Sequence, residues 1–361
     1  MVCRHSMIPH DRILAVLNRR PHDRTPVDIW LSPEVLADAK RHFRCEDELE
    51  VYRKLGLDKI VMVFPGFGSE DVDPDKGTGR TLWGVETRTV LAGKATYQEF
   101  MNPPFAAMTE WAELEAYDRW PNPDRIDYAG SLALARRARE FGFSTIGPWI
   151  SVFEIYCQLR GLENAMMDLI DAPDFLEPAL DRIQRIQSDI LERLLREANG
   201  LLDLVFISDD MASQEGMLIS LPTWRRLFDA RLRHWCDLVH RHGAKVLYHT
   251  DGAAFDLVPS LLDAGIDVLN PIQHVCKGMD RSRLKDVFGD RVIFHGGVEN
   301  QSILPFGTTD DVRAEVKRCL ETLGRKGGYI CSSCHFVQAG TPLDNVFALI
   351  ETVHQHGAIG L

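Results

Sequence analysis

Polar and metal-binding side chains gather in four short segments of this sequence, each at the end of a predicted β-strand. The segments span residues 206–210, 247–252, 294–299 and 329–335. In a parallel barrel all strands end on the same face, so side chains at these ends meet whatever their separation along the chain. The sequence therefore predicts one site that is assembled from several strand ends.

His249 and Asp251 form the first candidate pair for metal binding. Residues i and i+2 of an extended chain project to the same side, so both side chains can reach one point, and Gly252 then lets the backbone turn. Cys334 and His335 follow the last predicted strand and could complete the set. Three protein ligands with an open fourth position are typical of a catalytic zinc, so we predict a zinc site. Structural roles at the barrel rim are the alternative.

Carboxylates beside these strand ends are candidates for acid–base chemistry. Asp209 and Asp210 end one strand, and Glu154 follows another. Adjacent side chains of an extended segment point in opposite directions, so we expect one of the two aspartates to face the pocket, with capping of a helix as the alternative role. Near the same strand ends lie the residues that we expect to contact substrate, namely Trp149, Gln214, Asn270, Gln273, His295 and Glu299.

The segment Cys331-Ser-Ser-Cys334-His335 also has the spelling of a c-type haem attachment site. We do not predict haem here, because the segment coincides with a core strand and the sequence begins without the apolar stretch of an export signal. No G-x-G-x-x-G, P-loop or H-E-x-x-H pattern supports a nucleotide site or a zinc protease.

Composition excludes several classes of protein. The 361 residues carry a net charge of −12, which argues against a nucleic-acid partner because phosphate neutralisation needs a basic surface. Hydrophobic residues make up 45% of the chain, yet no run approaches the roughly 18 apolar residues of a membrane span. We therefore expect a cytoplasmic enzyme that acts on a small molecule. The sequence leaves open whether it forms a homodimer.

Apolar runs alternate with amphipathic helical patterns, which is typical of βα units. The eight predicted strands are 27–31, 59–64, 143–149, 202–208, 245–249, 267–270, 291–295 and 328–332. They predict an α/β fold that is a single (β/α)8 TIM barrel over residues 1–361. Helices are predicted over 174–199, 223–242 and 309–323.

Residues 65–122 break this rhythm after the second strand. They are too long for a βα loop and contain alternating pieces at 85–91 and 95–100, which predict an antiparallel insertion. Since it follows a strand, the insertion lies on the face of the predicted site, where it could serve as a lid or as a docking element for a partner. A structural excursion without function is the alternative.

Several segments resemble the uroporphyrinogen decarboxylase superfamily. They are Leu-Tyr-His-Thr-Asp-Gly at 247–252, the run at 262–273, Val-Ile-Phe-His-Gly-Gly-Val at 292–298, Leu-Pro-Phe-Gly-Thr at 304–308, and the segments at 10–14, 21–27, 208–211 and 218–222. The resemblance extends over the chain outside residues 65–120 and independently implies the (β/α)8 barrel. True decarboxylases of this family carry an Arg-Gln-Ala-Gly-Arg-type segment after the first strand. Here residues 30–36 read Trp-Leu-Ser-Pro-Glu-Val-Leu, so the arginines that would hold a porphyrinogen are missing.

The resemblance is closer to the zinc- and corrinoid-dependent methyltransferases of the superfamily. In that branch a His-x-Cys segment and a later cysteine bind zinc; here His249 matches the histidine, Asp251 replaces the cysteine, and Cys334 or His335 falls near the second cysteine. The resemblance thus implies a methyltransferase of the demethylase type that passes a methyl group from a small methyl ether to cobalamin on a separate corrinoid protein. Two alternatives remain open: a lyase or decarboxylase that acts on a small acid without corrinoid, and a barrel that only binds a ligand.

Overall fold

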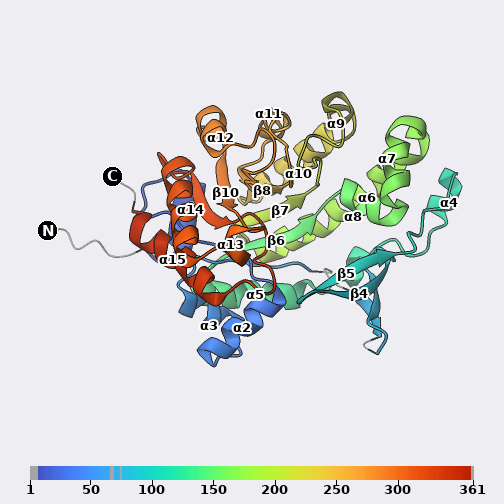
Figure 1. Cartoon of the computed structure of the whole chain (residues 1–361). Coiled ribbons are helices and arrows are strands. Elements are labelled where there is room, and N and C mark those ends of the chain that lie inside the picture. Colours follow the sequence, from blue (N-terminus) through green and yellow to red (C-terminus); the bar gives the residue numbers. More distant parts are fainter. Residues whose placement is uncertain (1–6, 66–68, 74, 359–361) are drawn as a thin grey trace.

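The centre of the molecule is a curled sheet of seven parallel strands, with helices around its outer face (Figure 1). The computed structural model describes residues 7–65, 69–73 and 75–358. In spatial order the strands are β1 (Ile60–Met62), β6 (Ser144–Ile150), β7 (Leu204–Ser208), β8 (Lys245–His249), β9 (Val268–Asn270), β10 (Ile293–Val298) and β11 (Tyr329–Ser333). These correspond to seven of the eight predicted strands.

The first predicted strand, 27–31, is not a strand, and the prediction of eight continuous barrel strands is confirmed only in part. This segment makes isolated parallel bridges from Val27 to Cys331 and from Leu31 to Val337. On its other side, the Ile60 N–H donates to the side chain of Asp28 at 3.2 Å. Because a carboxylate takes the donor that a regular ladder would pair with a backbone carbonyl, the segment lies beside β11 without continuous pairing to β1.

The helices alternate with the strands as expected for βα units. Those described are α1 (Pro9–Leu17), α2 (Pro33–Phe43), α3 (Glu48–Leu55), α4 (Trp111–Glu115), α5 (Tyr128–Glu140), α6 (Phe153–Arg160), α7 (Leu162–Asp171), α8 (Pro173–Ala198), α9 (Leu221–Leu227), α10 (Asp229–Arg241), α11 (Val258–Ala264), α12 (Arg281–Phe288), α13 (Ile303–Phe306), α14 (Thr309–Thr322) and α15 (Leu343–His356), with a 3-10 turn at Pro123–Arg125. The predictions for 174–199 and 309–323 match α8 and α14. The helix predicted over 223–242 is instead two helices, α9 and α10, which part at Phe228, a buried side chain that packs against Phe153.

Two apolar clusters stabilise this arrangement. The larger cluster lies between the sheet and the helices, as the outward-facing side chains of the strands require. The smaller cluster fills the inside of the curled sheet with one residue from most strands: Ile13, Val16, Leu17, Trp30, Ile60, Ile146, Leu204, Phe206, Leu247, Val268, Ile293 and Ile330. Three of these residues come from α1, which therefore packs into the interior, while Trp30 and Phe206 extend the cluster toward the strand ends.

Between β1 and β6 the chain forms a separate antiparallel sheet of four strands. They are β2 (Ser69–Asp73), β3 (Thr78–Thr81), β4 (Glu86–Ala92) and β5 (Ala95–Met101), so the antiparallel pieces predicted at 85–91 and 95–100 are present. Residues 66–68 and 74 of the predicted insertion lie outside the described residues. The β4–β5 hairpin, at the lower right of Figure 1, contacts the start of α2 where the Thr96 N–H donates to Glu34 at 3.0 Å.

Within the described ranges, no helix combines the length and the apolar character that crossing a bilayer requires.

Candidate metal and substrate site

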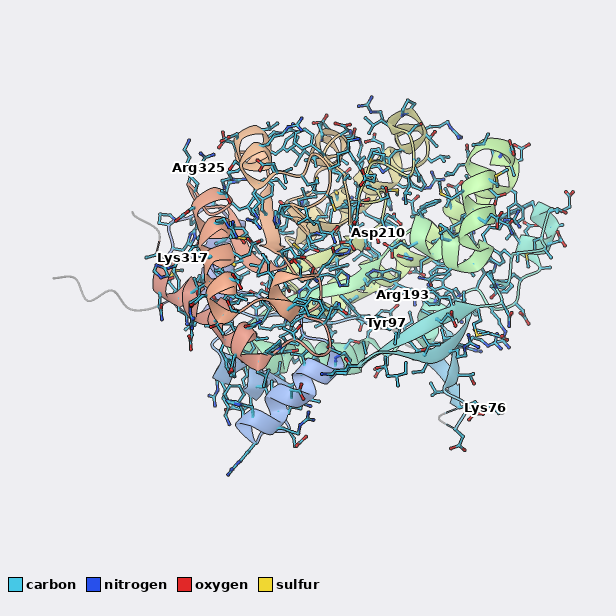
Figure 2. All side chains as sticks on the ribbon, viewed as in Figure 1. Lys76, Tyr97, Arg193, Asp210, Lys317 and Arg325 are labelled. Atoms are coloured by element: carbon cyan, nitrogen blue, oxygen red, sulfur yellow. The ribbon has the colours of Figure 1, made fainter. Side chains whose placement is uncertain are left out.

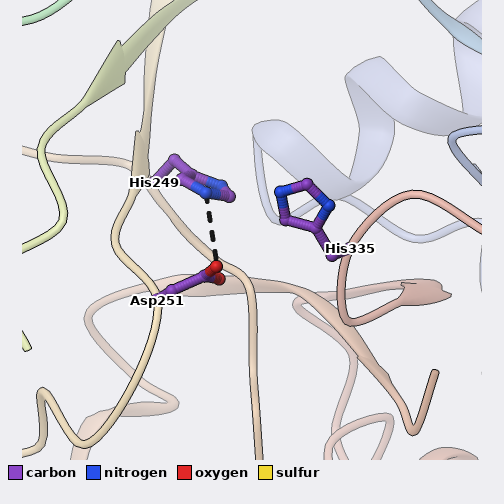
Figure 3. A group of neighbouring side chains, drawn as sticks. All are labelled: His249, Asp251 and His335. Carbon is purple, nitrogen blue, oxygen red and sulfur yellow. Dashed lines mark ion pairs between the residues drawn. The ribbon is translucent and has the colours of Figure 1, made fainter. Parts of the chain in front are cut away.

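His249, Asp251 and His335 converge on one point at the ends of β8 and β11. Their potential ligand atoms all lie within 4.8 Å of one another. The Nε2 atom of His249 is 3.8 Å from Oδ1 of Asp251, and the two imidazole centroids are 5.7 Å apart. Figure 3 shows the two rings and the carboxylate facing a common space. Gly252 follows with φ +89°, and a Cβ there would come within 2.5 Å of the Ser213 carbonyl, so the turn that positions Asp251 requires glycine.

The chemistry of this group fits a metal ion. Oδ1 of Asp251 is buried and has no hydrogen-bond partner, which is costly for a carboxylate oxygen that no ligand contacts. Burial raises the pKa of Asp251 to about 6, against the opposing effect of His249. Burial, reinforced by the neighbouring His249, lowers the pKa of His335 to about 4. His335 is therefore neutral at physiological pH and keeps a lone pair for a metal. Two imidazoles and one carboxylate match a common catalytic zinc set.

Cys334, the other predicted ligand, is not brought to this group. Its thiol is buried and donates to the carbonyl of Ile272 at 3.1 Å. Burial raises its pKa, which disfavours the thiolate form that binds metals. Of Cys334 and His335, which follow β11, only the histidine therefore reaches the centre.

A cavity of about 670 Å³ opens beside His249 and His335. Its wall is mainly apolar and aromatic, and Glu154, Ser208 and Asp210 are among its polar members. The apolar residues include Trp30, Met62, Phe64, Leu82, Trp83, Phe100, Trp149, Ile150, Ile155, Ile190, Phe206 and Phe336. Such a volume is typical of sites for small organic ligands, which bury most of their surface against apolar walls. Trp149, which was predicted to contact substrate, lines this cavity.

Glu154 is the carboxyl group of this wall with the most perturbed acidity. Burial, together with the charges of Asp210 and Asp209, raises its pKa to about 8. Ser208 donates a hydrogen bond to it at 2.5 Å, which opposes this shift without cancelling it. Glu154 is therefore mostly protonated at neutral pH and can donate a proton to a bound ligand.

The two aspartates that follow β7 have different environments, as the alternation of side chains predicted. Asp210 lines the cavity and accepts the N–H of Asp251 at 2.8 Å. It lies near the middle of the molecule, whereas Lys76, Lys317 and Arg325 lie at its periphery (Figure 2).

Asp209 instead stabilises the start of α6. It accepts hydrogen bonds from Ser151 Oγ at 2.6 Å, Phe153 N at 2.7 Å and Glu154 N at 3.0 Å, and more weakly from Val152 N. Burial still raises its pKa to about 6. The structure thus gives Asp209 a capping role, although on α6 rather than on the helix that follows it in sequence.

Asn270, His295 and Glu299, which were predicted to bind substrate, do not line the cavity. Asn270 and His295 are almost fully buried beneath it. Glu299 accepts from Gln301 N, Ser302 N and Ile303 N and so caps α13. The two glycines after His295 do not leave room for a ligand, because a Cβ on Gly296 would approach Ile272 N to 2.9 Å and one on Gly297 would approach Leu323 to 2.8 Å.

Of the two glutamines predicted to contact substrate, Gln273 lies beside the site and Gln214 does not. Gln273 accepts the Gly252 N–H at 2.7 Å and lines a second, more open cavity together with Asp251 and His335. Lys94 and Tyr97 of the β4–β5 hairpin form another part of that cavity. Gln214 is exposed and lies outside both cavities.

Sequence reasoning missed two charged residues of the interior, Asp28 and Lys59. They form an ion pair of 2.7 Å, and both are buried. The available signal was an aspartate inside the apolar run Val27-Asp-Ile-Trp-Leu31, where an unpaired charge would be costly.

The chain thus has an α/β fold of the barrel type, with a His/Asp/His group and an aromatic cavity at its strand ends. A family model described as uroporphyrinogen decarboxylase (URO-D) matches residues 89–356. The chain belongs to this family.

Individual relatives are distant. A uroporphyrinogen decarboxylase from Chromohalobacter salexigens is 24% identical over 96% of this chain and 98% of its own length. One from Alkalilimnicola ehrlichii is 23% identical over 97% of this chain and 95% of its own length. Among solved structures, a methyltransferase from Methanosarcina mazei matches with a TM-score of 0.68 at 20% identity, covering 97% of this chain and 99% of the other. At this identity the structural likeness supports the fold.

Proposed function

We propose that this protein is a zinc-dependent methyltransferase that removes a methyl group from a small methyl ether and passes it to a corrinoid protein. The observation that carries the proposal is the convergence of His249, Asp251 and His335 beside a cavity that also contains a protonated carboxylic acid, Glu154. Such a site combines groups that bind a metal with a proton donor for a leaving oxygen.

The ligand set supports this chemistry in its detail. Aspartate at position 251, where the methyltransferases of this family carry a cysteine, makes a harder ligand set that suits an oxygen substrate. When bound, zinc would supply Lewis-acid polarisation of the leaving oxygen. Oδ1 of Asp251, which has no hydrogen-bond partner, and the imidazoles of His249 and His335 are the groups of this chain that would hold it.

Glu154 would complete the reaction as the general acid. Breaking the O–CH3 bond leaves an alkoxide or phenoxide, which needs a proton, while the methyl group goes to the reduced corrinoid of the partner. The carboxyl proton of Glu154 is present at neutral pH and can pass to that oxygen, after which solvent returns a proton to the carboxylate. The aromatic wall around Trp149 would hold the apolar body of the substrate and exclude water.

The cavity also bears on the alternative function. The family and the relatives above bear the name uroporphyrinogen decarboxylase, which favours a carboxy-lyase as the second candidate. A substrate with many carboxylates needs cationic partners. Among the described residues of the cavity wall there is no arginine or lysine. A decarboxylase of this chain would therefore act on a small acid rather than on a porphyrinogen.

The insertion at 65–122 would form the docking element for the corrinoid protein. Its hairpin reaches over the strand ends, where the Tyr97 hydroxyl donates to Gln338 at 3.2 Å and Lys94 lines the cavity of Asp251 and His335. A partner bound to this hairpin could present its cofactor to the site through the second cavity, which Asp251 and His335 line.

The test is anaerobic incubation of the zinc-loaded protein with a reduced corrinoid protein and a panel of small methyl ethers. We expect methylated corrinoid to form with at least one ether and to be strongly reduced in His335→Ala. No methylation across the panel would refute the proposal. Release of CO2 from a small acid without corrinoid would support the decarboxylase instead.

A further inference from the structure

Four buried side chains run from His249 through the inside of the curled sheet. Asn270 Oδ1 lies 2.6 Å from His249 Nδ1, and Asn270 Nδ2 lies 2.7 Å from His295 Nδ1. His295 Nε2 lies 3.0 Å from Asp28, which pairs with Lys59 at 2.7 Å. We call this chain the interior relay; its members are Asn270, His295, Asp28 and Lys59, each at most 4% exposed.

We propose that the interior relay fixes His249 in the tautomer that carries its proton on Nδ1, so that the bare Nε2 faces Asp251 and His335. The relay consists of positioning residues, since its members would influence a bound metal only through His249. This inference rests on the proposed metal site, but it concerns the protonation of the free protein as well.

The direction of the hydrogen bonds follows from the far end of the relay. Asp28 pairs with the cation of Lys59 and also accepts the N–H groups of Ile60 and Trp30. Burial alone would raise the pKa of Asp28, but the Lys59 cation opposes this effect and the pKa is lowered. Asp28 is therefore a carboxylate and can only accept. Hence Nε2 of His295 carries a proton and donates it to Asp28.

The directions of the other hydrogen bonds in the relay then follow one after another. A neutral His295 with its proton on Nε2 has a bare Nδ1, which accepts from the amide nitrogen of Asn270. The amide oxygen of Asn270 consequently faces Nδ1 of His249, which must donate. The opposite orientation would need a second proton on His295 and would place two cations, Lys59 and His295, against the single carboxylate of Asp28 in a dry interior, which is costly.

Trp30 holds both rings of this arrangement in place. Its ring centroid is 6.1 Å from that of His249 and 5.5 Å from that of His295, each at an interplanar angle of 30°. Its indole N–H also donates to Asp28 at 3.3 Å. Rotation of either imidazole is thereby opposed by packing as well as by hydrogen bonds. Partners of this kind behind a ligating histidine typically change metal affinity by about 10- to 100-fold.

The first experiment measures the tautomer of His249 in the zinc-free protein. Long-range 1H–15N correlation spectra of 15N-histidine-labelled protein distinguish protonated from bare ring nitrogens, and His249→Gln assigns the signal. We expect a protonated Nδ1 and a bare Nε2 in the wild type. A protonated Nε2 would overturn the inference, and this result does not depend on zinc or on methyl transfer.

The second experiment measures zinc affinity by competition with a chromophoric chelator. Asn270→Ala should weaken zinc binding by about tenfold or more. Asn270→Asp keeps an acceptor for His249 and should retain more affinity than Asn270→Ala. The matched control is Asn345→Ala, which removes another buried asparagine, one that donates to the carbonyls of Leu304 and Gly307 and not to a histidine.

The outcomes separate the two proposals. Equal zinc affinity in the wild type and both Asn270 variants would overturn the relay while leaving the metal site intact. A wild-type protein that binds no zinc would refute the proposed function, whereas the tautomer of His249 would still support or overturn the relay. If Asn270→Ala does not fold, the wild-type tautomer remains decisive.

Discussion

Glu154 offers the sharpest test of the electrostatics of the site. Its pKa of about 8 in the folded protein differs from its value in the unfolded chain, so the free energy of unfolding must depend on pH. In the unfolded chain this carboxyl group ionises near pH 4.5, its ordinary value. Between that pH and about 8 the folded protein holds a proton that the unfolded chain has lost, so wild-type stability falls as the pH rises. Below about pH 4.5 both states are protonated and Glu154 has no effect.

Glu154→Gln removes this dependence while its amide oxygen can still accept from Ser208. Each pH unit in this window corresponds to about 1.4 kcal/mol, so the variant should gain roughly 2–3 kcal/mol over the wild type between pH 5 and pH 7. The measurement is the free energy of unfolding by urea, with a chelator present, at several pH values. We expect the difference in free energy of unfolding between the variant and the wild type to be negligible near pH 4 and to stay constant above about pH 8.

Asp267→Asn provides a contrast of opposite sign. Hydrogen bonds from His240, Val246 N and Lys245 outweigh burial and lower the pKa of Asp267, so this variant should lose stability, relative to wild type, as the pH rises through the acid range. A gap between wild type and Glu154→Gln that is the same at every pH would refute our interpretation of Glu154.

Two further predictions use neighbouring residues as controls. Purified wild type and Cys334→Ala should both contain about one equivalent of zinc, as expected for one structural or catalytic site, and His335→Ala should lose it; equal zinc in all three proteins by elemental analysis would exclude His335 as a ligand. Asp209→Ala removes the acceptor of four hydrogen bonds at the start of α6 and should lower the free energy of unfolding by roughly 3 kcal/mol. Asp210→Ala should lower it by less than about 1 kcal/mol. Equal losses in the two variants would contradict the different roles of these aspartates.

The periodicity of the sequence was sufficient to predict most of the fold, because strands and helices impose their periods directly on the pattern of apolar residues. It failed where a single side chain decided the backbone. Asp28 takes the Ile60 N–H and so prevents continuous pairing at 27–31, and nothing local reveals that contact. The break at Phe228 has no glycine or proline to signal it, since the reason lies in its packing against Phe153.

For the site, the alternation of side chains along a strand limits what the sequence can predict. Alternation predicts that Asp209 and Asp210 differ, but it does not say which of the two faces the cavity. That choice depends on the tilt of the strands and on partners such as the start of α6. Alternation gave no such distinction for Cys334 and His335, which were both predicted as metal ligands and lie in a bend after β11. The relay lies beyond any local rule, because Asp28 and His295 are 267 residues apart and meet only when the sheet curls. One general rule still applies to its members: polar side chains in apolar strands need partners, and Asp28, His295 and Asn270 find theirs in one another.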